Sequence, residues 1–190
     1  ATVLAVGDID NDGRDDLVAA FPPESSGRDT GLYVYSGGST KFGLHHWVPV
    51  PTQVVMADID GGGADLVANF PGRGVRIRYN NGLWTQLHTQ NPTAMVAGNF
   101  DGLGLDDLAM IFPGSGTWLW RYGGAWLQLH PLDATKMAAG NLDQDGRADL
   151  VLDFSSLGLW ILRNLTDWTP PHVLPPRHPV LADRDPNGRN

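Results

Sequence analysis

The chain has 190 residues, a hydrophobic content of 42% and a formal net charge of −8, so it can bury a core and offers no basic surface for nucleic acid. It contains no apolar run long enough to cross a bilayer, and the absence of Cys excludes a disulfide framework. Gly and Pro, 24 and 14 residues respectively, interrupt the sequence at short intervals, which favours short strands over helices.

The acidic residues are unevenly distributed. The chain has 20 Asp and one Glu, and 16 of these 21 side chains fall within five short loops. Asp favours turns, whereas Glu favours helices. Carboxylates at this density repel one another unless a cation lies between them. The loop carboxylates belong to Asp8, Asp10, Asp12, Asp15, Asp16, Asp58, Asp60, Asp65, Asp101, Asp106, Asp107, Asp143, Asp145, Asp149, Asp183 and Asp185.

The first unit starts with an apolar run at 3–7, followed by an acidic loop, the segment DLVAAF at 16–21, a Gly-led alternating segment at 31–35 and an aromatic-to-His segment at 42–46. It also carries an insert that includes Glu24, Arg28 and Asp29. The same four elements return at 54–57, 65–70, 74–79 and 84–88; at 95–99, 107–112, 116–122 and 126–130; and at 137–141, 149–154, 158–164 and 168–172. The histidines that end the units are 42 residues apart, at His46, His88, His130 and His172.

Four short strands in each repeat, separated by turn residues, are typical of a β-propeller blade. We therefore predict an all-β β-propeller of four-stranded blades in a single domain, with blades at 1–50, 51–91, 92–133 and 134–175 and the start of a fifth at 176–190. A ring of roughly six to eight blades is usual. Four blades thus indicate a partial ring, with the remaining blades in a longer chain or in another chain.

Loop 1 (residues 8–16) has the composition of a metal site. It places side-chain oxygens at loop positions 1, 3, 5 and 9 and a carbonyl at position 7, from Asp8, Asp10, Asp12, Asp16 and Arg14. Such oxygen ligands select a hard cation, and Ca²⁺ suits a flexible loop better than Mg²⁺. The loop is not an EF-hand, because Ala19 occupies the place of the bidentate Glu.

The motif D-x-D-x-D-G-x-x-D ahead of an aliphatic strand, repeated in blades, resembles the FG-GAP/VCBS repeats of integrin-α-like propellers and secreted bacterial proteins. The resemblance extends over essentially the whole chain. It implies that Ca²⁺ binds between adjacent strands of one blade. The implied ligands are those given above for loop 1 and, in loop 4 (141–149), Asn141, Asp143, Asp145, Arg147 (carbonyl) and Asp149. It also implies a secreted protein that serves recognition or adhesion, and extracellular calcium is high enough to fill such sites.

The other three loops depart from this pattern. In loop 3 (99–107) Leu103 occupies position 5, so we expect weak or water-completed binding by Asn99, Asp101, Leu105 (carbonyl) and Asp107. Loop 2 (58–65) lacks one residue and the middle carboxylate, which predicts an empty tight turn. Loop 5 offers Asp183, Asp185 and Asn187 as ligands but stops before its ninth residue.

Features that recur in every blade favour an architectural role. We expect the recurring His rings to be hydrogen-bonded at strand ends, and Phe42, Trp84, Trp126 and Trp168 to pack between blades. Positions that vary are better ligand candidates, since propeller ligands contact variable loops and edges. They are Tyr33, Tyr35, Asn69, Arg76, Arg78, Trp118, Trp120, Asp153 and Trp160. For the aromatic ones, packing between blade sheets is the favoured interpretation and ligand stacking is the alternative.

No nucleophile elbow, zinc-binding helix motif or phosphate loop occurs in the sequence, so we predict that the chain is not an enzyme. A glycosidase with paired carboxylates stays open. The favoured function is lectin-like recognition or cell adhesion, with a glycan or an extracellular protein as ligand and without nucleic acid or membrane insertion. The alternatives are a propeller enzyme, an accessory module of a secreted polysaccharide-degrading enzyme or phospholipase, and a structural spacer.

Overall fold

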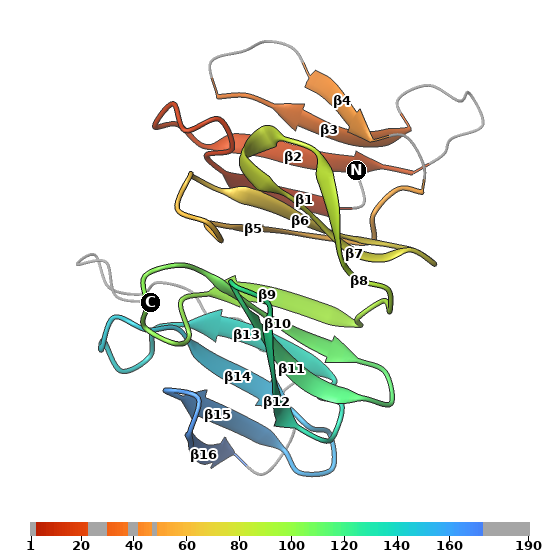
Figure 1. Cartoon of the computed structure of the whole chain (residues 1–190). Helices are drawn as coiled ribbons and strands as arrows, with labels where there is room; N and C mark the ends of the chain where they lie inside the picture. The colour runs from red at the N-terminus through yellow and green to blue at the C-terminus, as the bar shows by residue number, and fades with distance from the viewer. Residues whose placement is uncertain (1–2, 23–29, 38–41, 47–48, 173–190) are drawn as a thin grey trace. The chain divides into compact units, whose positions relative to one another are not determined.

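The computed structural model describes residues 3–22, 30–37, 42–46 and 49–172 (Figure 1). These residues form four separate four-stranded sheets, in which neighbouring strands are antiparallel. The predicted all-β fold of four-stranded blades is confirmed. The chain divides into two compact units, Ala1–Pro92 and Thr93–Asn190, each with two sheets. Within the described ranges, no helix has the length and apolarity to span a membrane.

The first unit contains blades 1 and 2. Blade 1 consists of β1 (Val3–Gly7), β2 (Asp16–Phe21), β3 (Gly31–Tyr35) and β4 (Phe42–His46). Blade 2 consists of β5 (Gln53–Ala57), β6 (Asp65–Phe70), β7 (Gly74–Arg78) and β8 (Trp84–His88), with the short 3-10 turn η1 (Tyr79–Asn81) after β7. Strands β1 and β5 are neighbours. A core that includes Ile9, Val18, Leu32 and Leu66 lies within this unit.

The second unit contains blades 3 and 4. Blade 3 consists of β9 (Ala94–Gly98), β10 (Asp107–Phe112), β11 (Gly116–Arg121) and β12 (Ala125–His130). Blade 4 consists of β13 (Lys136–Gly140), β14 (Asp149–Asp153), β15 (Leu159–Arg163) and β16 (Asp167–His172). Strands β9 and β13 are neighbours. Phe100, Leu119, Leu150 and Leu152 are fully buried members of its core.

The second strand of each blade is the most deeply buried. Every residue of β6, β10 and β14 is buried, which explains why these segments are almost continuously apolar after their initial Asp. That Asp pairs with the last residue of the first strand: Gly7 with Asp16, Ala57 with Asp65, Gly98 with Asp107 and Gly140 with Asp149. Each acidic loop is therefore the connection of an antiparallel pair, and its ends are held together by the sheet.

A register shift recurs where the third strand of each blade pairs with the fourth. It lies between Leu32 and Tyr33, Val75 and Arg76, Thr117 and Trp118, and Leu159 and Ile161. In each blade the shift adjoins the pair made by the terminal His, for example Val75 with His88. A bulge re-aims the side chains beside it. The recurring His therefore marks a recurring backbone irregularity.

Candidate metal loops and an aromatic pocket

Loop 1 brings three carboxylates together. Oxygens of Asp8, Asp10 and Asp16 lie within 4.8 Å of one another. The carboxylate of Asp8 accepts the backbone N–H groups of Asp12 at 3.1 Å and Gly13 at 2.8 Å, and these bonds fold the loop back on its first residue. Gly13 has a φ of 83°, a conformation that suits glycine. The loop thus has the shape of an oxygen-lined turn.

Asp16, the ninth residue of loop 1, is 1% exposed. One of its oxygens accepts the N–H of Ile9 at 2.9 Å and the other accepts the N–H of Gly37 at 2.8 Å. These bonds fix a buried carboxylate beside those of Asp8 and Asp10. Three converging carboxylates on a folded turn fit Ca²⁺, which takes oxygen ligands in flexible geometry.

In loop 4, a buried carboxylate oxygen of Asp149 indicates that the loop fits a cation. Asp149 is 1% exposed; its Oδ2 accepts the N–H of Leu142 at 2.8 Å, whereas its Oδ1 is buried and has no hydrogen-bond partner among the described residues. Burial raises the pKa of Asp149, and the charges of Asp143 and Asp145 raise it further. An unpartnered buried oxygen is costly, and a bound cation would satisfy it.

The side chains of two predicted loop 4 ligands, Asn141 and Asp145, accept hydrogen bonds from the backbone of the same loop. Asn141 Oδ1 accepts the N–H of Gln144 at 2.7 Å, and Asp145 Oδ1 accepts the N–H of Arg147 at 2.8 Å. Across the described residues, carboxylates converge in groups of three in loops 1 and 2 but not in loop 4. The donor set of loop 4 is nonetheless that of loop 1, with Asn141 in the place of Asp8.

Loop 3 carries two comparable features. Asn99 Oδ1 is buried without a partner in the described part of the chain. Burial and the neighbouring charge of Asp101 raise the pKa of Asp107 to about 6. Leu103 is 81% exposed, so position 5 supplies no side-chain ligand. Weak or water-completed binding at this loop stays a prediction.

Loop 2, predicted to be an empty tight turn, nevertheless brings three carboxylates together. Oxygens of Asp58, Asp60 and Asp65 lie within 4.8 Å of one another, although the loop is shorter. The side chain of Asn80 enters this group, because its Nδ2 donates to Asp60 at 2.7 Å. Burial raises the pKa of Asp65, and the N–H of Asn80 lowers it again by donating to that carboxylate.

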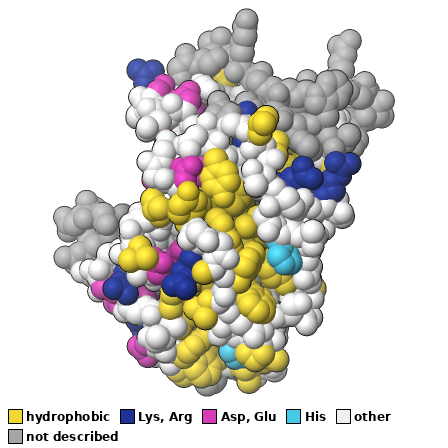
Figure 2. All heavy atoms as spheres, in the orientation of Figure 1, with side chains coloured by type: hydrophobic (Ala, Val, Ile, Leu, Met, Phe, Trp, Pro, Cys, Tyr) yellow, Lys and Arg dark blue, Asp and Glu magenta, His cyan; other side chains and the backbone are white. Residues whose placement is uncertain are grey.

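Several predicted residues lie outside the part of the chain that the structure describes. These are the ligands of loop 5, Asp183, Asp185 and Asn187, and the residues of the insert, Glu24, Arg28 and Asp29. On the face that Figure 2 shows, acidic side chains reach the surface and a few Lys and Arg side chains lie among them.

Two of the recurring histidines, His88 and His130, are hydrogen-bonded at strand ends as the repeat predicts, whereas the side chains of His46, His172 and Phe42 lie outside the part of the chain that the structure describes. His88 Nδ1 accepts the N–H of Gln90, and His130 Nδ1 accepts the N–H of Leu132, both at 3.1 Å. The ring of His130, from blade 3, also packs on blade 4: its centroid lies 4.5 Å from that of Phe154 and 5.7 Å from that of Trp168. The prediction of packing between blades is thus confirmed for Trp168.

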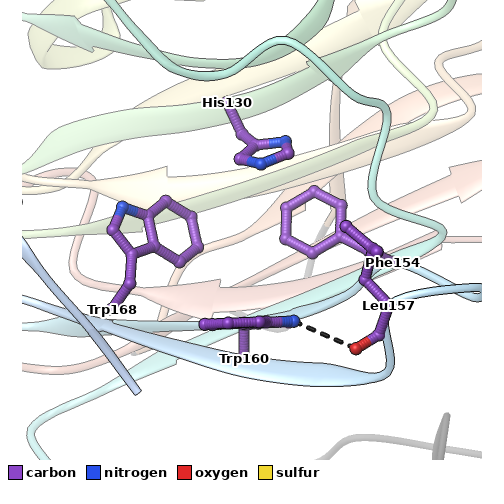
Figure 3. Close-up of a pocket in the computed structure, with 5 residues that line it drawn as sticks. All are labelled: His130, Phe154, Leu157, Trp160 and Trp168. Atoms are coloured by element: carbon purple, nitrogen blue, oxygen red, sulfur yellow. Dashed lines mark hydrogen bonds between the residues drawn. The ribbon is translucent and has the colours of Figure 1, made fainter. Parts of the chain in front are cut away.

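The same rings border a pocket of about 170 Å³ in the second unit. It is lined by His130, Phe154, Leu157, Trp160 and Trp168, and Figure 3 shows the four rings around a common space. Trp160 Nε1 donates to the carbonyl of Leu157 at 3.1 Å, which fixes the indole (Figure 3). The Trp160 and Trp168 rings meet edge to face, with centroids 6.4 Å apart. Among the residues that the structure describes, no carboxylate lines this pocket.

Sequence reasoning assigned Trp168 and His130 to packing alone and therefore missed their place beside Trp160. Leu157 is the signal that was available. It is 45% exposed and occupies the turn position held by Arg73 in blade 2 and Ser115 in blade 3. A leucine at a turn position that is polar in blades 2 and 3 departs from the repeat, and variable loop positions are the better ligand candidates.

Other ligand candidates lie in structural positions. Trp120 is 5%, Asn69 2% and Asp153 3% exposed. The amide of Asn69 donates to Pro92 O at 3.0 Å and accepts from Asn91 Nδ2. Asp153 accepts the N–H of Ser155 at 3.0 Å. Burial and local bonding favour a structural role for these three residues.

The remaining candidates are half-buried and lie on the third strands of their blades. Tyr33 meets Phe21 edge to face at 5.7 Å between ring centroids. Arg78 Nε donates to Gly82 O at 2.8 Å, and Trp118 Nε1 donates to Ser115 O at 2.8 Å. Arg76 holds in blade 2 the strand position that Tyr33 and Trp118 hold in blades 1 and 3, and Tyr35 holds in blade 1 the position of Arg78. Of all the predicted ligand residues, Trp160 is the one that lines the pocket described above.

Comparison with known proteins supports the sequence resemblance and the fold. The sequence model of the FG-GAP repeat matches residues 1–35, which confirms the predicted resemblance for blade 1. No curated protein matches the sequence.

Solved structures with a similar fold match nearly the whole chain. A BBS1N chain in complex with ARL6DN, from a crystal soaked with lead, is 16% identical with a TM-score of 0.65, over 92% of this chain and 55% of that one. The same complex soaked with mercury is 14% identical with a TM-score of 0.59, over 90% of this chain and 54% of that one. An Agrocybe aegerita lectin that recognises non-reducing terminal N-acetylglucosamine is 17% identical with a TM-score of 0.55, over 85% of this chain and 49% of that one. The chain spans about half the length of these proteins, and the likeness shows the propeller fold.

Proposed function

We propose that this chain is part of a secreted, calcium-stabilised propeller that recognises a glycan, and that a sugar ring or its apolar substituent binds in the aromatic pocket. The observation that carries the proposal is the pocket itself, where Trp160 and Trp168 stand with His130 and Phe154 around one space. Aromatic rings present flat apolar faces that suit the C–H face of a sugar.

The size and chemistry of the pocket favour one sugar unit. Its volume of about 170 Å³ is below the roughly 300–1,000 Å³ of sites for drug-sized ligands. The pocket lies on two blades, since His130 ends β12 whereas Trp160 and Trp168 belong to β15 and β16. Its shape therefore depends on the packing of blade 3 against blade 4. The similar lectin recognises N-acetylglucosamine, which makes this sugar the first probe.

Calcium would act on the scaffold. When bound, Ca²⁺ supplies positive charge and oxygen coordination at loops 1 and 4. Asp16 and Asp149 each begin the buried second strand of their blade, so their position couples each loop to the blade core. The first two strands of blade 4, β13 and β14, are joined by loop 4, and this blade carries Trp160. Calcium at loop 4 would thus stabilise the blade that forms most of the pocket.

The described residues that line the pocket offer no chemistry for cleavage. Hydrolysis of a glycosidic bond generally requires a pair of carboxyl groups, and no carboxyl group occurs among the described residues that line the pocket. The Nδ1 atom of His130, the imidazole among these residues, already accepts a backbone N–H. We therefore propose binding without catalysis.

The test is titration of the full chain with N-acetylglucosamine and a glycan panel, followed by tryptophan fluorescence. Stacking of a nucleobase on an aromatic side chain contributes roughly 1–3 kcal/mol, and we take this as the scale for a sugar ring stacked on Trp160. We therefore expect Trp160→Ala to weaken binding about 5- to 150-fold. Trp118→Ala is the matched control, because Trp118 occupies the equivalent place in blade 3, makes the same indole bond and does not line this pocket. Equal effects of both substitutions, or no glycan response in the unmodified chain, would overturn the proposal.

A further inference from the structure

Loop 2 is the acidic loop that fits calcium least well. It has seven residues between its strands, 58–64, against eight in 8–15, 99–106 and 141–148. Gly62 stands where loop 1 has Asp12, so no carboxylate occupies the middle of the loop. The remaining carboxylates still converge within 4.8 Å, and their mutual repulsion has to be offset.

The protein offsets this repulsion with N–H donors. Asp58 accepts the N–H of Gly61 at 2.8 Å, and Asp65 accepts that of Ile59 at 3.0 Å. The decisive donor is Asn80, which follows β7. Its side-chain Nδ2 donates to Asp60 Oδ2 at 2.7 Å, and its backbone N–H donates to Asp65 Oδ1 at 2.8 Å. One residue thus connects two of the three carboxylates.

The amide of Asn80 lies directly against the loop backbone. A Cβ atom added to Gly62 would lie 2.0 Å from Asn80 Oδ1. Asn80 reaches this place with a φ of 44°, a conformation that few residues other than glycine and asparagine adopt readily. The absence of a side chain at residue 62 is what makes room for the amide.

The equivalent residues in blades 1 and 4 make no such contact. In blade 1 the backbone N–H is supplied by Gly37, again at 2.8 Å from the ninth loop residue, Asp16, but glycine has no amide side chain to follow it. In blade 4 the equivalent residue is Asn164, with a φ of 50°, and Asp149 Oδ1 is without a hydrogen-bond partner in the described residues. Blade 2 therefore satisfies its loop from within the chain.

We propose that the Asn80 amide takes the place of a cation in loop 2, so that blade 2 keeps its acidic loop folded without calcium. The role of Asn80 rests on hydrogen bonds and does not depend on metal elsewhere. The contrast with loops 1 and 4 rests on the proposed calcium binding.

The first test compares melting temperatures of the full chain in EDTA. Asn80→Gly keeps the backbone N–H and suits the positive φ, so it removes the amide alone. We expect its Tm to fall by roughly 2–4 °C, and that of Asn80→Asp to fall further because a fourth carboxylate replaces a donor. Asn164→Gly, the same change at a similar φ in blade 4, should leave Tm unchanged. If Asn80→Gly has the same Tm in EDTA as the unmodified chain, the proposal is wrong.

The second test counts bound calcium by equilibrium dialysis. We expect Asp60→Ala to leave the count unchanged and Asp10→Ala, the same loop position in blade 1, to lower it by one. A loss of one Ca²⁺ from Asp60→Ala would show that loop 2 holds a cation and would overturn the inference. If the unmodified chain binds no calcium, the proposed calcium sites fail, while the EDTA comparison still decides the role of Asn80.

Discussion

Replacing Asp149 with Asn should change the stability of this chain in opposite directions with and without calcium. Asp149 is buried, accepts one N–H from Leu142, and has an Oδ1 without a hydrogen-bond partner among the residues that the structure describes. In EDTA, Asp149→Asn removes a buried charge beside Asp143 and Asp145, so the variant should melt at the same temperature as the unmodified chain or higher. In calcium it lacks a charged ligand and should melt lower.

The size of the calcium effect follows from mass action. A site that binds only the folded state stabilises it by about 2.7 kcal/mol when free calcium is a hundredfold above Kd. For a chain of 150–250 residues, about 1 kcal/mol shifts Tm by roughly 2–4 °C. Loss of the loop 4 site should therefore reduce the calcium-induced rise in Tm by roughly 5–11 °C.

The assay is differential scanning calorimetry of both proteins in EDTA and in calcium. Asp153→Asn serves as the control, because Asp153 is buried on the same strand, β14, and lies outside the acidic loop. We expect Asp153→Asn to keep the full calcium response. An equal calcium-induced shift in the unmodified chain and in Asp149→Asn would refute the assignment of Asp149 as a ligand.

Two further predictions concern the blade scaffold and are checked by chemical denaturation. Gly74→Ala should destabilise the fold by more than the roughly 1–2 kcal/mol expected from positive φ alone, because the new Cβ would lie 2.1 Å from the carbonyl oxygen of His88. Gly72→Ala, with a similar φ and no atom within 4 Å, should show only the conformational cost, and equal losses would contradict the steric argument. Leu152→Ala should cost about 2–5 kcal/mol, since Leu152 is fully buried, whereas Leu132→Ala, 47% exposed, should cost less than about 0.5 kcal/mol. A small loss at Leu152 would show that this core position is not packed as described.

The strand pattern was predictable because it depends on short-range physics. Alternation in the Gly-led segments and the apolar run after Asp16, Asp65, Asp107 and Asp149 define strands locally, and the repeat fixes which strands share a blade. The position of the acidic loops follows directly, since each one connects two adjacent antiparallel strands.

The details of the sites were less predictable because they depend on contacts between distant residues. Asn80 reaches Asp60 across 20 positions through the turn η1, which the sequence pattern does not reveal. The aromatic pocket requires His130 of one blade to meet Trp168 of the next, so residues assigned to packing also line a space. Trp120 carries no local signal that separates its buried position from the half-buried one of Trp118.

The most direct measurement is anomalous diffraction from crystals of the full chain grown with calcium. The account predicts anomalous peaks within loop 1, beside Asp8, Asp10 and Asp16, and within loop 4, beside Asp149, with no peak in loop 2, where the Asn80 amide lies against Asp60. Loops 1 and 4 without peaks at saturating calcium would contradict the calcium-stabilised propeller, and a peak between Asp58, Asp60 and Asp65 would contradict the role given to Asn80.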